Sequence, residues 1–186
     1  MIDLRFPLPS AVSAEGREWK VRTGWRWWLE FGYLLRTERV IWHGVLEEPP
    51  DGPMGAELMG ALVGFYAPAE ELPRDAGGGS HERAVDPMVD GSLIVAAFQQ
   101  AYGIDLTSHE ADGIHWHRFR ALLAGIPQDT ALARVMGVRT WDPAREKEKR
   151  ETAMGRAKAA WRLPEAGDDD WVRKQQEWFG AAAAAE

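Results

Sequence analysis

Apolar residues recur with a period near 3.6 over much of the chain, which is the pattern of helices that turn one face toward a core. Between Asp90 and Tyr102 they fall at i, i+1, i+4, i+5, i+8 and i+9 and form a single stripe. Residues 54–66 are apolar over a broader face. Residues 24–35 are apolar almost all round, so we expect this helix to be buried on several sides or to share an interface.

Three stripes end in the same way, with a glycine followed by an apolar residue, at Gly103, Gly125 and Gly137. A glycine in the left-handed conformation often ends a helix, and the apolar residue after it folds back onto the last turn. We therefore predict three short helices within residues 88–138. Asp86 and Asp129 are predicted to be the N-caps of the first and the third.

The two ends of the chain follow other patterns. Residues 1–22 alternate apolar with polar side chains and are broken by two prolines and by Glu15-Gly16, which predicts a small β-hairpin. A charged helix is predicted from Pro143 to about Arg162. Charge then changes sign, because residues 141–163 hold seven basic against four acidic residues, whereas 164–186 hold two against six. A basic helix followed by an acidic segment can pair within the chain or along a row of copies.

These patterns predict a mainly α-helical protein, a compact bundle of short helices with a small N-terminal β-hairpin and a C-terminal charged helix. We assign residues 1–140 to a helical domain and residues 141–186 to the charged helix and an acidic extension. Residues 67–87 hold three prolines and a Gly-Gly-Gly-Ser run, which indicates a flexible loop between two packed parts.

Composition narrows the classes of function. The 186 residues suffice for one domain with a sizeable core, and a net charge of -7 argues against binding of nucleic acid over a broad surface. The absence of Cys excludes disulfides, thiolate metal sites and cysteine nucleophiles. We see neither a secretory signal nor a run of about 20 apolar residues, so we expect a cytoplasmic protein without a membrane span.

Residues that favour catalysis or metal binding are sparse. Possible metal ligands cluster only between His109 and His117. On a helix His115 and His117 would point about 200° apart, and no HExxH pattern is present, so we expect no metal site. The glycine run at residues 77–79 lacks the Lys-Ser/Thr of a phosphate loop, and no serine lies in a Gly-x-Ser-x-Gly elbow. We expect a protein that is not an enzyme and has no cofactor.

Trp is unusually frequent, with ten in 186 residues. Four of them fall on helical apolar stripes and belong to a core or to a helix-binding interface. Trp171 and Trp178 lie seven apart in the acidic segment, which places both on one helix face as exposed anchors. The predicted protein-binding residues are Trp25, Trp28, Trp116, Phe119, Leu123, Trp161, Trp171 and Trp178.

Three runs lie close together in the second half of the chain: LIVAAFQQAYGIDL at residues 93–106, IHWHRFRALLAGIPQDT at 114–130 and VMGVR at 135–139. With these runs, residues 90–139 resemble the bacteriophage gene-product-fifteen family. The resemblance is weaker over residues 15–66, where the aromatic helix fits the opening of the family.

The resemblance implies a tail assembly chaperone of long-tailed phages and prophages, encoded between the major tail protein and the tape-measure protein. Such a protein is mainly helical and not enzymatic; it coats the tape-measure protein, recruits tail-tube subunits and self-associates. The implied partners are thus the tape-measure protein and the major tail protein. The implied location is the host cell cytoplasm, with absence from the mature virion. The alternative is a structural virion protein, such as a tail-completion or head–tail connector subunit.

Overall fold

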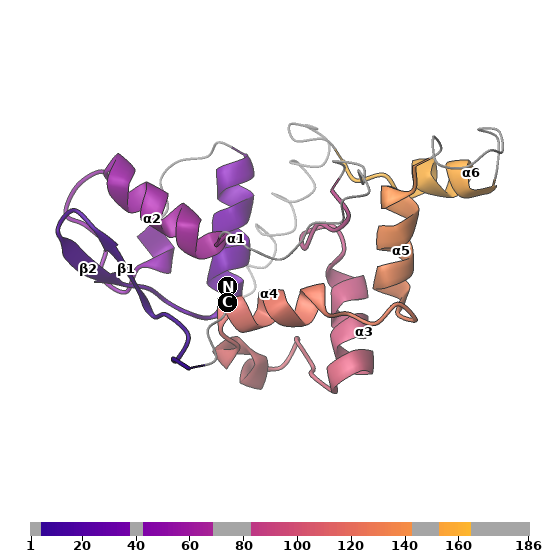
Figure 1. Ribbon diagram of the computed structural model, residues 1–186, viewed down its shortest axis with the longest axis horizontal. Coiled ribbons are helices and arrows are strands. Elements are labelled where there is room, and N and C mark those ends of the chain that lie inside the picture. The colour runs from indigo at the N-terminus through magenta and orange to yellow at the C-terminus, as the bar shows by residue number, and fades with distance from the viewer. Residues whose placement is uncertain (1–4, 38–42, 69–82, 143–152, 165–186) are drawn as a thin grey trace, which may run out of the picture.

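The computed structural model describes residues 5–37, 43–68, 83–142 and 153–164 (Figure 1). It is mainly helical with a two-stranded N-terminal sheet, which confirms the predicted fold class. The elements in chain order are β1 (Ala11–Ala14), β2 (Arg17–Lys20), α1 (Trp25–Arg36), the 3-10 helix η1 (His43–Val45), α2 (Ala56–Tyr66), α3 (Gly91–Tyr102), the 3-10 helix η2 (His109–Gly113), α4 (Trp116–Ala124), α5 (Ala131–Thr140) and α6 (Ala153–Ala160).

Helix α4 joins the two sides of the molecule. Figure 1 shows the hairpin, α2 and α1 on one side, α3 and α5 on the other, and α4 running between α1 and α3 at their base. Helix α2 packs on β1, α5 packs on α3, and α6 packs on α5. Only residues 153–160 of the predicted charged helix are seen as helix, because residues 143–152 lie outside the described part.

The hairpin is antiparallel, with Ala11 opposite Lys20 and Ala14 opposite Arg17. Its two turn residues both have positive φ, 55° at Glu15 and 72° at Gly16, which is the backbone twist that a two-residue hairpin turn prefers. The N–H of Glu15 donates to a carboxylate oxygen of α2 at 2.8 Å, so α2 helps to hold a conformation that is unusual outside glycine.

Aromatic rings form the centre of the core. Trp28 is fully buried and stacks on Phe65 at 4.4 Å between ring centroids, which joins α1 to α2. Phe119 of α4 is also fully buried and stacks on Phe98 of α3 at 5.2 Å. Burial of a side chain of this size contributes roughly 1.5–3 kcal/mol. These aromatic side chains therefore pack between the helices and hold them together.

The predicted glycine stops are confirmed only in part. Gly103 has φ 66° and ends α3 in the left-handed conformation. Gly125 ends α4 with φ -89°, so it is not left-handed. The stop at Gly137 is wrong, because α5 continues through it to Thr140. The reason is a tertiary contact. The side chain of Arg139, in that last turn, forms a buried ion pair, which stabilises the helical conformation of the residues after Gly137.

Both predicted N-caps are wrong. Helix α5 is capped by Thr130 rather than Asp129, and the Thr130 hydroxyl accepts the N–H three residues on at 3.1 Å. Helix α3 begins after Asp90, four residues later than expected. Asp86 instead accepts the N–H of Met88 at 3.0 Å and stabilises the turn that precedes the helix.

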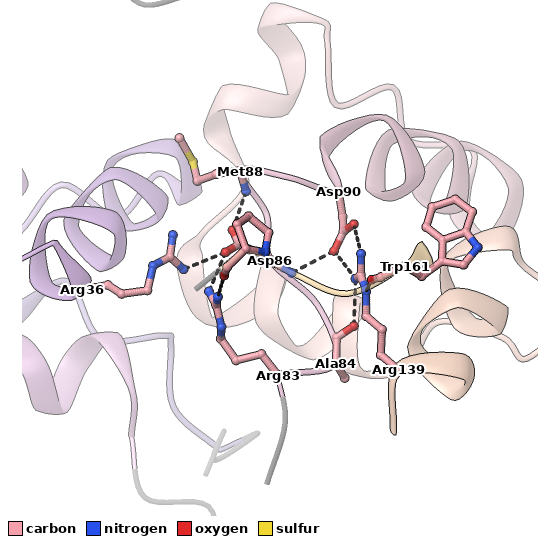
Figure 2. A network of polar contacts seen from close by, with 9 residues as sticks. Arg36, Arg83, Ala84, Asp86, Met88, Asp90, Arg139 and Trp161 are labelled. Carbon is pink, nitrogen blue, oxygen red and sulfur yellow. Dashed lines mark hydrogen bonds and ion pairs between the residues drawn. The ribbon is translucent and has the colours of Figure 1, made fainter. Parts of the chain in front are cut away.

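A buried ion pair connects α5 to the start of α3. Arg139 and Asp90 are 4% and 3% exposed, and two guanidinium nitrogens of Arg139 meet the two carboxylate oxygens at 2.6 and 2.8 Å (Figure 2). Arg139 also donates to the carbonyl oxygens of Ala84 at 3.1 Å and of Trp161 at 2.7 Å. One side chain thus holds together the turn before α3, the end of α5 and the end of α6.

A second carboxylate extends this network to α1. Asp86 is buried, lies 2.9 Å from Arg36 at the end of α1 and 2.6 Å from Arg83 (Figure 2). Its backbone N–H donates to the Asp90 carboxylate at 2.9 Å. We call these five side chains, Arg36, Arg83, Asp86, Asp90 and Arg139, the Asp86–Asp90 network.

Replacement of Arg139 by Ala is expected to lower the free energy of unfolding by about 3 to 5 kcal/mol, because it leaves the buried Asp90 carboxylate without its cation. Urea unfolding followed by circular dichroism measures the change. The matched control is Arg134→Ala on the exposed face of the same helix, for which a change within about 0.5 kcal/mol is expected. Equal effects of the two substitutions would contradict the role given to the pair.

Candidate functional site

An apolar pocket of about 710 Å³ lies between α1 and α3. Its volume is within the range of pockets that take small molecules or partner side chains, roughly 300–1,000 Å³. Helix α1 supplies one wall, α3 and the turn before it supply the other, and α4 contributes to the floor. The lining residues are Trp25, Arg26, Leu29, Glu30, Tyr33, Leu34, Pro87, Met88, Gly91, Ile94, Val95, Leu106 and Phe119.

The two faces of α1 explain why it is apolar almost all round. Trp28 and Phe31 on one face are buried, and each has an aromatic contact with α2. Trp25, Leu29 and Tyr33 recur at i, i+4 and i+8 and line the pocket instead. One face of α1 is therefore buried against α2, and the second face, which lines the pocket, is only partly covered.

The floor of the pocket is held in a fixed orientation. The rings of Trp25 and Phe119 are nearly parallel, with 4.7 Å between centroids and 9° between planes. The indole N–H of Trp25 donates to the carbonyl oxygen of Ala111 at 2.9 Å. Phe119 is fully buried and Trp25 is 7% exposed, so Phe119 supports the Trp25 ring and offers no accessible surface of its own.

The opposite wall depends on the Asp86–Asp90 network. Gly91, Ile94 and Val95 recur at i, i+3 and i+4 on α3 and face the pocket. Pro87 and Met88 line the end nearest to α1's last turn, in the loop between the two buried aspartates. Since those aspartates fix the loop on both sides, they also fix the position of this wall.

The rim carries the charged groups. Arg26 pairs with Asp112 at 2.5 Å and donates to the carbonyl oxygen of Leu106 at 2.8 Å. Glu30 lies one turn further along α1, and partial burial raises the pKa of its carboxyl above the ordinary value. The arrangement is an apolar trough with one basic and one acidic group at its edge. It suits apolar side chains from one face of an amphipathic helix.

The pocket brings together two of the eight predicted binding residues, Trp25 and Phe119. Trp28 and Trp116 are buried in the core at 0% and 5% exposure and do not line it. Trp116 stacks on a tyrosine of α2 at 5.3 Å and donates its indole N–H to the backbone of the same residue. Leu123 is half-buried against the core.

The other three predicted residues lie toward the C-terminus. Trp161 follows α6 and is 45% exposed, whereas Trp171 and Trp178 lie outside the described residues. Sequence reasoning missed most of the pocket, including Leu29, Tyr33 and the Pro87-Met88 pair. The spacing of Trp25, Leu29 and Tyr33 was the one available signal.

The histidine pair is placed differently from the sequence prediction. His115 has extended backbone angles and precedes α4, so the separation of about 200° from His117 is wrong, and the two rings lie 5.2 Å apart. Each ring is bound to backbone, with Nε2 of His115 2.8 Å from the carbonyl oxygen of Pro9 and Nε2 of His117 2.9 Å from that of Phe65.

The second ring nitrogen of His115 is also engaged. Its Nδ1 accepts the N–H of His117 at 3.1 Å and so caps α4. Among the residues that the structure describes, no group of three or more potential ligands is placed to hold a metal ion. In the same residues no helix is long and apolar enough to cross a membrane.

A comparison with protein families finds one that covers half of the chain. The family model described as "Bacteriophage Gp15 protein" matches residues 71–163. The match contains the α3 wall and Phe119 of the pocket, and it also contains Asp86, Asp90 and Arg139 of the network. Neither the curated proteins nor the solved structures contain a match.

The protein is expected to lose stability as the pH falls below about 6.5, with His117 as one cause. Burial lowers the pKa of this imidazole from its ordinary value of 6.5, helped by the nearby charges of His115 and Arg120. The unfolded chain therefore takes up this proton at a higher pH than the folded protein does. The stability from this group is present above 6.5 and is lost as the pH falls from that value through the lowered pKa of the folded protein.

Urea midpoints measured from about pH 8 to about pH 5 test this expectation. His117→Gln retains a donor for the Phe65 carbonyl oxygen but does not titrate, so its midpoint should fall less steeply than that of the natural protein. Identical slopes for the two proteins would show that His117 contributes nothing to the pH dependence.

Proposed function

The chain belongs to the bacteriophage Gp15 protein family, and from this membership we propose that it is a tail assembly chaperone. It binds helical segments of the tape-measure protein, keeps them soluble until the tube forms around them, recruits tail-tube subunits and self-associates along the partner. The structural observation that supports the proposal most directly is the apolar pocket between α1 and α3.

The dimensions of the pocket support a helical ligand. Its α1 wall runs from Trp25 to Leu34, ten residues whose Cα atoms span about 14 Å along the helix axis. Apolar anchors at i, i+3, i+4 and i+7 of a bound helix span about 10 Å, so three or four of them fit along the wall. Trp25, which is supported by the buried Phe119, and the half-buried Tyr33 offer aromatic surface, which is the type that dominates binding energy at protein interfaces.

The charge of the protein supports a chaperone role as well. A net charge of -7 disfavours binding to nucleic acid. It also favours the solubility of a complex between the chain and a bound partner. Glu30 on the rim offers an acidic group to the polar face of a bound helix, whereas Arg26 is already paired with Asp112. An apolar helix that is aggregation-prone alone would therefore be soluble when bound.

Val95→Asp is expected to weaken binding of the tape-measure protein at least about tenfold, because it places a carboxylate in the apolar wall. The measurement is co-purification and titration with the tape-measure protein encoded beside this chain. The matched control is Val63→Asp on α2, the same substitution on a helix surface outside the pocket, where Val63 is 38% exposed. Binding that is unchanged by Val95→Asp, with both variants folded, would exclude this pocket as the site.

A chaperone is also expected to form oligomers whose size rises with concentration and to be absent from the finished particle. Light scattering over a concentration series measures the first property, and mass spectrometry of purified mature virions measures the second. Stoichiometric amounts of the chain in virions would favour the alternative, a structural protein such as a tail-completion or head–tail connector subunit.

A further inference from the structure

The described chain ends beside the pocket. The carbonyl oxygen of Pro164 accepts a hydrogen bond from Arg83 at 2.7 Å, and the same guanidinium lies 2.6 Å from Asp86 (Figure 2 shows Arg83 and Asp86). The next two residues after Asp86 are Pro87 and Met88, which line one end of the pocket. The described chain therefore ends, at Pro164, near the end of the pocket that Pro87 and Met88 line.

Charge at this end favours the residues that come next. The Asp86–Asp90 network sets three guanidinium groups against two carboxylates, which leaves one positive charge in excess. Arg36 and Arg83 carry it at the surface, with side chains 28% and 38% exposed. Residues 165–170 contain four acids in six positions. Exposed ion pairs contribute only about 0–1 kcal/mol, so this attraction orients the segment rather than holding it.

The aromatic residues beyond these acids match the pocket in spacing. Six extended residues reach up to about 20 Å, which is enough to carry residues 165–170 along the rim. On a helix, the seven-residue spacing of Trp171 and Trp178 would place both indoles on one face, about 10 Å apart along the axis. The pocket offers about 14 Å of apolar wall. Both indoles can lie in it together.

From this anchoring, charge and spacing we propose that residues 165–186 dock on their own chain and fill the pocket between α1 and α3 with Trp171 and Trp178. A tether of six residues gives the segment an effective concentration in the millimolar range, which favours its own chain over a second copy. The docking itself does not depend on the proposed function. Only its consequence rests on that function, namely that a tape-measure helix must displace the segment before it binds.

The chain has no Cys, so an introduced pair of cysteines can form only one internal disulfide. The variant Glu30→Cys/Gln175→Cys places one thiol on the rim and the other between the two indoles on their helix face. The matched control is Glu18→Cys/Gln175→Cys, because Glu18 is exposed on β2, away from the pocket. Under mild oxidation the internal disulfide of the first variant is expected to form at least about tenfold faster.

Two further results show whether the indoles are needed for docking and whether the segment docks on its own chain or on a second copy. Addition of Trp171→Ala and Trp178→Ala to the first variant should reduce its rate to that of the control, as followed by non-reducing electrophoresis and peptide mass spectrometry. Equal rates for the rim and control pairs, or no effect of the Trp substitutions, would overturn the proposal. Covalent dimers as the main product would also overturn it, since the segment would then dock on a second copy.

This experiment contains no tape-measure protein, so its outcome is separate from the test of the proposed function. A disulfide that forms as expected, together with no binding of the tape-measure protein, would reject the function and keep the docking. Binding of the tape-measure protein without the disulfide would do the reverse. Melting temperatures of all variants show whether a lost disulfide reflects a lost fold.

Discussion

The structure depends on one buried ion pair, Arg139 with Asp90. Two charges taken out of water are stable together only if their hydrogen-bonding groups are also satisfied, and here the arginine uses three nitrogens on a carboxylate and two backbone carbonyls. That requirement dictates where α5 ends, where α3 begins and where the chain passes after α6. Through the neighbouring Asp86 it also sets Pro87 and Met88 against the last turn of α1. The shape of the pocket is thus a consequence of electrostatics outside it.

Local patterns in the sequence were sufficient for the elements but not for their ends. The hairpin at Glu15-Gly16 and the helix stop at Gly103 follow from backbone preferences, which act on neighbouring residues alone. The failure at Gly137 has another origin, because the turn that continues α5 is stabilised by a partner 49 residues away in sequence. Distant contacts also explain why Asp86 is not an N-cap. Its carboxylate forms ion pairs with two arginines instead of accepting hydrogen bonds from the first turn of a helix.

The candidate site was predictable to a lesser degree. Helical periodicity places Trp25 and Trp28 on the same largely apolar helix but does not say which neighbour covers each side, and only Trp25 reaches the pocket. Pro87 does not belong to any periodic apolar pattern in the sequence. It lies in the wall because of the Asp86–Asp90 network beside it. The high Trp content therefore indicated many contacts between aromatic rings. The tertiary structure determines which of these rings are buried in the core and which line the pocket.

The capping of α4 by His115 has a consequence for the order of folding. The ring that caps this helix also binds the carbonyl oxygen of Pro9, a residue 106 positions earlier in the chain. Phe119, one turn into the same helix, covers Trp25. During synthesis the hairpin and α1 therefore leave the ribosome well before the segment that completes them. Closure of such long loops is slow, so the nascent N-terminal half presents uncovered aromatic rings until α4 has emerged.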